Sequence, residues 1–406
     1  MLRTSLYVCA CITTVLVAGS LFRVAATKGE KIGGAAPGGS NTLRLIEPIQ
    51  YENLIIFPVV SSRSADTAGF ATLDDALAAG DAVVSEGGTN VIRRTRDGGP
   101  VTSPQQIPQQ RGASVNQLVL INRGSRPLVL LAGEMVSGGK QDRIIAKDRI
   151  VPPGAEPIPL DVFCVEQSRW SSGAQFSAGN IMVHPSVREK AAVDKQQEKV
   201  WAAVRNGTTS DSGVAAGSGS GTGEGHSSSP TGTGPSPGAP LAAVVTPQSI
   251  DGVVAREAPT KSYRNIYQSR TVNSAAEPFV EEVKRRFARR IAGLKGESVV
   301  GVVVAYGGEL AWSDIFASGE MFARYWPKLL PSYVVEALAR PQTKEQASLD
   351  DAREFLRPLT GHETAESEPG VYRLTQVTQG RYVEIELEAL RPANIMLHEL
   401  RIHRTS

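Results

Sequence analysis

The sequence contains only three cysteines, and two of them lie near the N-terminus. Cys9 and Cys11 fall within the first 26 residues, so Cys164 stands alone in the rest of the chain. One cysteine provides no internal disulfide, and stability in an oxidising compartment must then come from the core. Because Cys164 lies in an apolar run, a buried structural thiol is the simpler interpretation than a catalytic nucleophile.

An excess of charge of one sign is also lacking. Arg3 and Arg23 account for the whole formal charge of +2, and the remainder has as many basic as acidic side chains. Such a chain has no net field to attract polyanions, so we expect no nucleic-acid binding. The five histidines show no HxH, HxxxH or HExxH spacing and the Gly-rich runs show no Walker pattern. We therefore expect no zinc site and no cofactor, whereas a carboxylate-rich ion site stays open.

Long uncharged runs are rare, and the one at residues 6–22 follows Arg3 and precedes the small residues Val24, Ala25 and Ala26. This order is typical of a signal peptide over residues 1–26 that is cleaved after Ala26. The run is at the lower edge of the length that spans a bilayer, so an uncleaved anchor or membrane tether is the alternative. Both interpretations predict export, to the periplasm or the exterior.

Two stretches are too poor in apolar residues to form a core. Residues 27–40 read as a flexible tether, and 27 of the 34 residues at 207–240 are Gly, Ser, Thr or Pro. Such compositions cannot bury enough apolar surface to offset chain entropy. From composition alone, the second stretch is either a linker between two domains or an insertion within one.

The first half of the chain reads mainly as strands. Short aliphatic runs bounded by Gly, Pro, Asn and Ser occur at residues 54–60, 118–121, 128–131 and 158–165. They are typical of an antiparallel sandwich or barrel, and the turn at 122–125 predicts a hairpin. Helices are expected over residues 73–79 and 187–205, the second with a capping box of Ser186 and Glu189.

The second half alternates between helical and strand periods. An amphipathic helix is predicted to open at Ser274 and to stop near Gly296, before a buried strand at 299–306. Helical segments follow at 319–329 and 332–339, and then two paired strands at 383–389 and 395–403, with His398 on the core side. The fold class is therefore α+β, with a β-sandwich or barrel-like first half.

Polar residues crowd two strand ends in the first half. The segments are GEMVSGGKQDR at 133–143 and CVEQSRW at 164–170. The Gly pair lets a ligand approach the backbone, and basic side chains beside it suit an anion. The candidate ligand-binding residues are Lys140, Gln141, Arg143, Arg169 and Trp170. We expect a small anionic or sugar-like ligand, with Trp170 stacking on a base or sugar.

Two other interpretations remain open for these segments. In a hydrolase, Glu134 or Glu166 would activate water with Asp314 or Asp142 as the second carboxylate, as glycoside chemistry requires. In a structural protein of the cell envelope, the same residues would only stabilise a Gly-Gly hairpin. No pair of acids has a diagnostic spacing, so a binding module is preferred.

One helix also carries a basic face. Its cations are Lys284, Arg285, Arg286, Arg289 and Arg290, preceded by Glu277, Glu281 and Glu282. Lipid or an acidic partner could bind there. A solvated face that complements the helix dipole is the simpler interpretation.

The motif GExxxGGKQxR, from Gly133 to Arg143, is followed by CVExxRW and later by Asp314 and Tyr333. Together they resemble the ARG and rhodanese-phosphatase-superfamily-associated protein domain. The resemblance extends from about Leu43 to about His403, on both sides of the Gly/Ser-rich stretch. It implies a single domain over 41–406 in which 207–240 is an insertion. It supplies no established catalytic residues, and the association of the family with ADP-ribosylglycohydrolases implies a connection to nucleotides or ADP-ribose.

Overall fold

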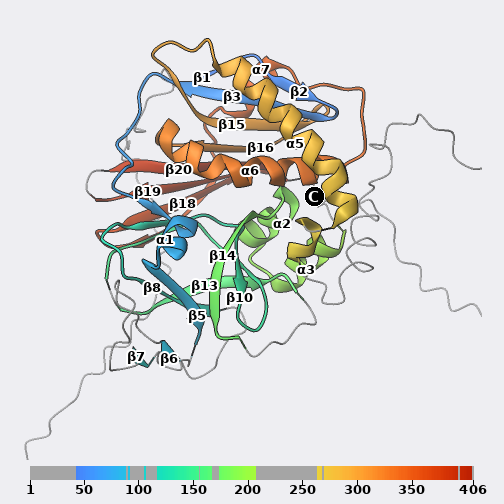
Figure 1. Cartoon of the computed structure of the whole chain (residues 1–406). Coiled ribbons are helices and arrows are strands. Elements are labelled where there is room, and N and C mark those ends of the chain that lie inside the picture. Colours follow the sequence, from blue (N-terminus) through green and yellow to red (C-terminus); the bar gives the residue numbers. More distant parts are fainter. Residues whose placement is uncertain are drawn as a thin grey trace, which may run out of the picture. The chain divides into compact units, whose positions relative to one another are not determined.

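A computed structural model describes residues 43–87, 90–91, 105–106, 117–154, 156–166, 173–206, 263–267, 269–391 and 394–404. All of them belong to one compact unit, Pro37–Ser406. The predicted leader, tether and insertion lie outside the described residues. The fold is α+β, as predicted, with a small barrel, a large antiparallel sheet and helices that pack on both (Figure 1).

Six strands of the first half close into a barrel in the order β10-β11-β13-β8-β5-β14. In chain order they are β5 (Ala82–Glu86), β8 (Gln117–Asn122), β10 (Glu134–Gly138), β11 (Arg143–Ile145), β13 (Ile158–Cys164) and β14 (Gln175–Met182). Alternate side chains such as Leu118, Leu120 and Val136 are buried in one cluster, as period-2 patterning requires. Closure leaves this sheet without a free edge.

The predicted hairpin at 122–125 is wrong. A separate sheet joins β12 (Arg149–Val151), β9 (Leu128–Leu130) and β4 (Ala71–Thr72), and β8 pairs instead with β5 and β13. The Asn122 side chain explains the departure, because its amide donates to the carbonyls of Arg126 (2.9 Å) and Val151 (3.1 Å). It thereby directs the chain into another sheet. A two-stranded pair, β6 (Asn90–Val91) and β7 (Gln105–Gln106), completes the first half.

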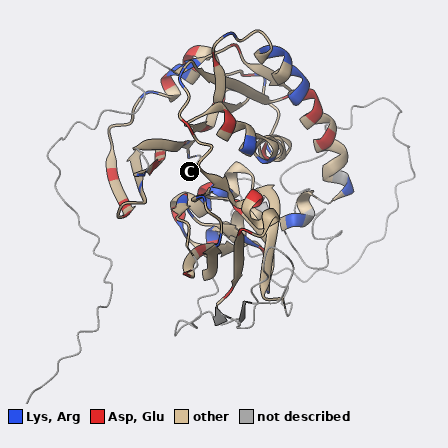
Figure 2. Ribbon diagram, turned by 60° about the vertical axis from the view of Figure 1, so that its left-hand side comes forward, with Lys and Arg blue, Asp and Glu red and all other residues tan. Residues whose placement is uncertain are grey.

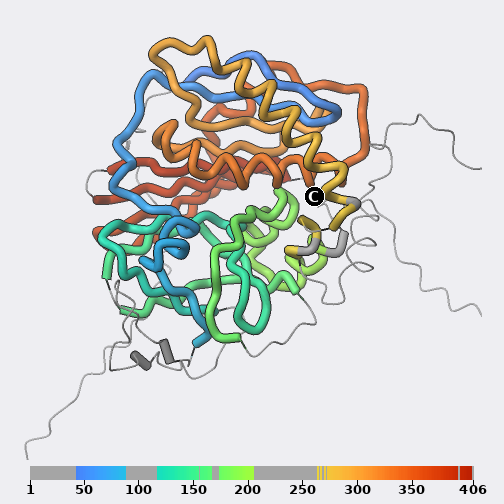
Figure 3. Tube along the Cα trace, viewed as in Figure 1, coloured from blue at the N-terminus to red at the C-terminus, as the bar shows by residue number. Residues whose placement is uncertain are grey.

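The large sheet has the strand order β1-β3-β15-β16-β20-β19-β18-β17, with β2 paired to β3. Its members are β1 (Leu43–Leu45), β2 (Ile49–Tyr51), β3 (Leu54–Ser61), β15 (Ser298–Tyr306), β16 (Glu309–Phe316), β17 (His362–Glu368), β18 (Tyr372–Gln379), β19 (Tyr382–Ala389) and β20 (Ile395–His403). The predicted pairing of the last two strands is confirmed. The strand β3, expected in the first-half sheet, lies here beside β15 (Figure 3). Both strands are buried on both faces, as expected for strands in the interior of a sheet that is covered on each side.

The helices agree with the sequence in part. The first, α1 (Leu73–Ala79), has the predicted bounds and ends at Gly80 with φ 75°. The expected helix at 187–205 is divided into α2 (Pro185–Glu189), a π-helical turn (Lys190–Asp194) and α3 (Gln197–Asn206). The backbone of Lys195 is in the left-handed conformation, with φ 53°, and this separates the π-helical turn from α3. A 3-10 turn (Tyr263–Tyr267) precedes α5 (Arg270–Ile291), whose cap is Ser269 and not Ser274.

Helix α6 (Gly319–Ala339) is continuous where two segments were predicted, and it contains Pro327 and Pro331. It contacts β15 and β16 of the large sheet and β14 of the barrel (Figure 1). The Tyr325 hydroxyl donates to the carbonyl of Val129 in β9, 3.0 Å away. Contacts on both sides hold this helix together across its prolines. A short helix that the sequence did not reveal, α7 (Leu349–Phe355), follows it.

Candidate functional site

The turn between β10 and β11 is held in one conformation by its own residues. Gly138 and Gly139 have φ values of 127° and 53°, which favour glycine. The Asp142 carboxylate accepts a hydrogen bond from the Gly138 amide at 3.0 Å, and the Glu166 carboxylate accepts one from the Asp142 amide at 2.8 Å. Glu166 therefore supports the turn from the end of β13.

The basic residues of this turn differ in exposure. Lys140 is exposed, and its backbone amide donates to Oε1 of Glu86 at 3.0 Å. Arg143 is 1% exposed and donates from Nη1 to the Gln141 carbonyl at 2.8 Å. Its Nε is buried without a partner in the described part of the chain. Gln141 is buried beside it, while Arg169 and Trp170 lie outside the described residues.

Glu134 lies at the opposite end of β10. It is buried and forms an ion pair with Lys328 of α6, and its Oε2 accepts from the Leu131 amide. Lys328 also contacts Oδ2 of Asp74 at 2.6 Å. Burial opposes protonation of Lys328, but the two carboxylates outweigh it and raise the pKa of that ammonium. The ion pair thus joins α6 to the barrel.

The third candidate acid, Asp314 on β16, is in the interior. Its Oδ1 lies 2.7 Å from Arg188 Nη1 and 2.9 Å from His398 Nε2, and its Oδ2 accepts from Trp312 Nε1 at 2.8 Å and from the Tyr333 hydroxyl. Burial would raise the pKa of this carboxyl, but Arg188 and its hydrogen-bond donors outweigh burial and hold the pKa well below the usual range.

His398 connects Asp314 to a second acid. Its Nδ1 lies 2.5 Å from Oδ2 of Asp148, whose Oδ1 accepts from the Ala132 amide at 2.7 Å. Arg188 Nε donates to the Ala132 carbonyl at 2.7 Å. Burial lowers the pKa of His398, but the two carboxylates outweigh it and raise the pKa to about 9. These residues tie β20 and β16 to the loops that flank β10 and β12.

Two of the candidate carboxylates, Glu134 and Glu166, are not brought together. Glu134 and the Gly138 turn stand at opposite ends of β10, roughly 13 Å apart at about 3.3 Å per residue, and Glu166 is on the turn side. Glu134, Glu166 and Asp314 are each at most 1% exposed. Hydrolysis of a glycoside needs two carboxyl groups about 5–9.5 Å apart with room for water. No observation here favours that arrangement.

The turn and its supporting residues lie within a family domain that spans most of the chain. A family model described as the ARG and Rhodanese-Phosphatase-superfamily-associated Protein domain matches residues 42–406. The chain belongs to this family. The matched range covers the barrel, the large sheet and the buried cluster around Asp314. Comparison with curated proteins and with solved structures finds no match.

The domain of this family contains a cluster that the sequence reasoning did not assemble. Arg188, Asp148 and Tyr333 surround Asp314 and His398, but none was a candidate. The sequence contains one indication of Arg188, which is its position in a predicted helix next to Val187, a residue that is buried. Within the described ranges, no helix has both the length and the apolar character to cross a membrane, and no three His, Cys, Asp or Glu gather as metal ligands.

Proposed function

We propose that this domain is an exported binding module that holds an anionic, carbohydrate-like or nucleotide-like ligand at the 138–143 turn. The observation that carries the proposal is the state of Lys140. Its ammonium is exposed and has no hydrogen bond or ion pair with any described residue, at the tip of a turn fixed by Asp142 and Glu166. Because hydrogen bonds already fix the backbone of the turn, the conformational cost of binding an anion falls on the Lys140 side chain.

The neighbouring residues support an anionic ligand. Arg143 Nε is buried without a hydrogen-bond partner in the described ranges, while its Nη2 lies 3.9 Å from Oε1 of Glu86. A guanidinium fork suits phosphate or carboxylate oxygens. Arg169 and Trp170 are proposed to complete the site from the following segment.

Thermal unfolding of the full chain against ADP-ribose, nucleotides, sugars and sugar phosphates tests the proposal. A ligand that binds the folded state raises Tm, and at 100 times Kd it adds about 2.7 kcal/mol. We expect at least one probe to raise Tm and Lys140→Ala to remove that increase. Lys344→Ala, at another exposed lysine, is the matched control and keeps it.

Two outcomes would contradict a binding module. Release of sugar or phosphate from the bound probe, lost in Glu134→Gln with binding retained, would establish the hydrolase alternative. No shift with any probe, together with a lower Tm in Lys140→Ala and Arg143→Ala, would leave the structural envelope protein as the better explanation.

A further inference from the structure

Four arginines of α5 form one basic side of the helix. Arg285, Arg286, Arg289 and Arg290 occupy positions i, i+1, i+4 and i+5, which lie on the same side. Figure 2 shows the basic residues gathered toward the C-terminal end of α5. In the described part of the chain, Glu282 is the one carboxylate that forms ion pairs with them, contacting Arg285 and Arg286. Four guanidinium charges thus face one carboxylate.

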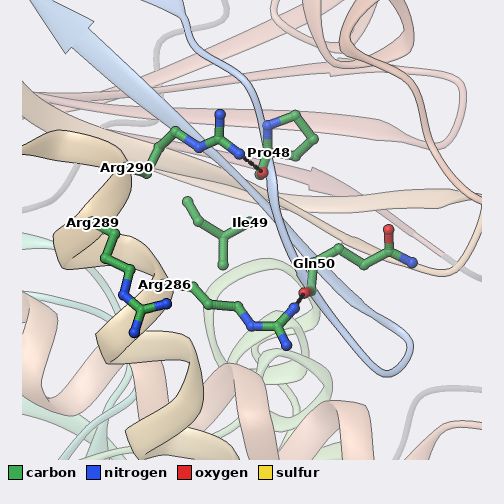
Figure 4. A pocket seen from close by; sticks show the side chains of 6 residues that line it. All are labelled: Pro48, Ile49, Gln50, Arg286, Arg289 and Arg290. Atoms are coloured by element: carbon green, nitrogen blue, oxygen red, sulfur yellow. Dashed lines mark hydrogen bonds between the residues drawn. The ribbon is translucent and has the colours of Figure 1, made fainter. Parts of the chain in front are cut away.

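A pocket of about 550 Å³ lies beside this side of the helix (Figure 4). Its lining residues are Pro48, Ile49, Gln50, Arg286, Arg289 and Arg290. The buried Ile49 provides an apolar floor, and the three arginines provide the charge. Ligand pockets commonly have volumes of about 300–1,000 Å³, so this one has room for more than a single small ion.

Two of the three guanidinium groups are positioned by the backbone opposite. Arg286 donates to the Gln50 carbonyl, and Arg290 Nη2 donates to the Pro48 carbonyl at 3.3 Å. Arg286 also lies over the Tyr51 ring, 5.1 Å from its centroid. The neutral carbonyls orient these groups without cancelling their charge, and the Glu282 carboxylate offsets part of the charge of Arg286. Each guanidinium has five N–H donors, so most of them remain available to a ligand.

Arg289 differs from its neighbours. It is exposed and makes no hydrogen bond or ion pair with any residue that the structure describes. Complementing the helix dipole would explain cations in the last turn, but such a role needs no pocket and no bond to residues 48 and 50. Oriented arginines around an unpaired one are instead suited to phosphate oxygens, which a guanidinium binds through two parallel hydrogen bonds.

We propose that the pocket between α5 and residues 48–50 binds a ligand that carries phosphate groups, through Arg286, Arg289 and Arg290. This site shares no residue with the 138–143 turn, so it is a second anion site and stands independently of the proposed function. The phosphate belongs either to a soluble polyphosphorylated compound or to the headgroup of an anionic phospholipid, and the experiment separates these two sources.

Calorimetric titration of the full chain with tripolyphosphate, and co-sedimentation with vesicles of phosphatidylcholine with and without phosphatidylglycerol, test the proposal at about 0.15 M salt. We expect binding of one or both probes by the wild type. In the double variant Arg289→Gln/Arg290→Gln we expect affinity to fall at least tenfold. Saturation by tripolyphosphate alone identifies a soluble ligand, and preferential sedimentation with phosphatidylglycerol identifies a headgroup.

The control variant Arg353→Gln/Arg357→Gln removes the same charge from exposed arginines of another part of the chain. Its affinity should stay within twofold of the wild type, and its unfolding curve should match that of the test variant. The proposal is overturned if the wild type binds neither probe, or if the control loses as much affinity as the test variant. It is also overturned if Lys140→Ala abolishes binding while the arginine double variant retains it.

Discussion

Nε2 of His398 lies 2.9 Å from Oδ1 of Asp314, while the other ring nitrogen lies 2.5 Å from Asp148. Both nitrogens of an imidazole donate only when the ring is protonated. The ring is fully buried, so its positive charge is balanced within the protein by the carboxylates of Asp148 and Asp314. The cluster is therefore an ionic contact between β20 and the loop before β12, and its protonation should contribute to stability.

The stability of the protein should fall as pH rises from about 6.5 to about 9. The folded pKa of His398 is raised to about 9, above the value of about 6.5 in an unfolded chain. Its contribution is complete below pH 6.5 and is lost as pH rises through the folded pKa, a loss on the order of 3 kcal/mol. Urea unfolding of the wild type and of His398→Gln across this range measures it, and equal slopes in the two proteins would contradict it.

Replacing Asp314 by Asn should cost about 3–5 kcal/mol of unfolding free energy, because Arg188 would remain buried without its charge partner. Asp350→Asn on α7 is the control, since Asp350 is exposed and its ion pair with Arg353 contributes about 0–1 kcal/mol. Chemical unfolding of both variants makes the comparison. A loss in Asp314→Asn no larger than that of the control would show that the ionic cluster contributes little.

Gly138→Ala should destabilise the 138–143 turn strongly. An added Cβ would lie 2.6 Å from the Gln175 carbonyl oxygen, and the φ of 127° is strained for alanine. Gly293→Ala has open space around it and no such φ, so it should be neutral or stabilising by up to about 1 kcal/mol. Thermal unfolding compares the two. Equal melting temperatures would mean that the turn relaxes at little cost.

Lys328→Met should lower the unfolding free energy by about 3–5 kcal/mol, because Glu134 would be left as a buried, unpaired charge. Adding Glu134→Gln should restore part of that loss, since the amide oxygen still accepts from Leu131. A double-mutant cycle by urea unfolding measures the coupling. Additive effects of the two substitutions would contradict a direct pairing.

The local features of the fold were readable from the sequence. Helix α1 has the predicted bounds because Thr72 caps it and Gly80 ends it, and both signals lie within the segment. The strands β19 and β20 were predicted because their alternation is local as well. The class of the fold followed from such patterns, and the family resemblance followed from the 133–143 and 164–170 segments together with later residues such as Asp314 and Tyr333.

What only the tertiary structure decided depends on partners distant in sequence. Strand β3 belongs to the large sheet and not to the barrel, because its partner is β15, about 240 residues later in the sequence. Both strands are buried on both faces, which requires covering elements on each side of the sheet. Helix α6 stays continuous across Pro331 because the sheet and the barrel pack on both sides of it. The tertiary structure also decided the burial and the charged partners of two of the candidate acids. Sequence showed that Glu134 and Asp314 were present, but their burial beside Lys328 and Arg188, which distant elements contribute, determined their partners.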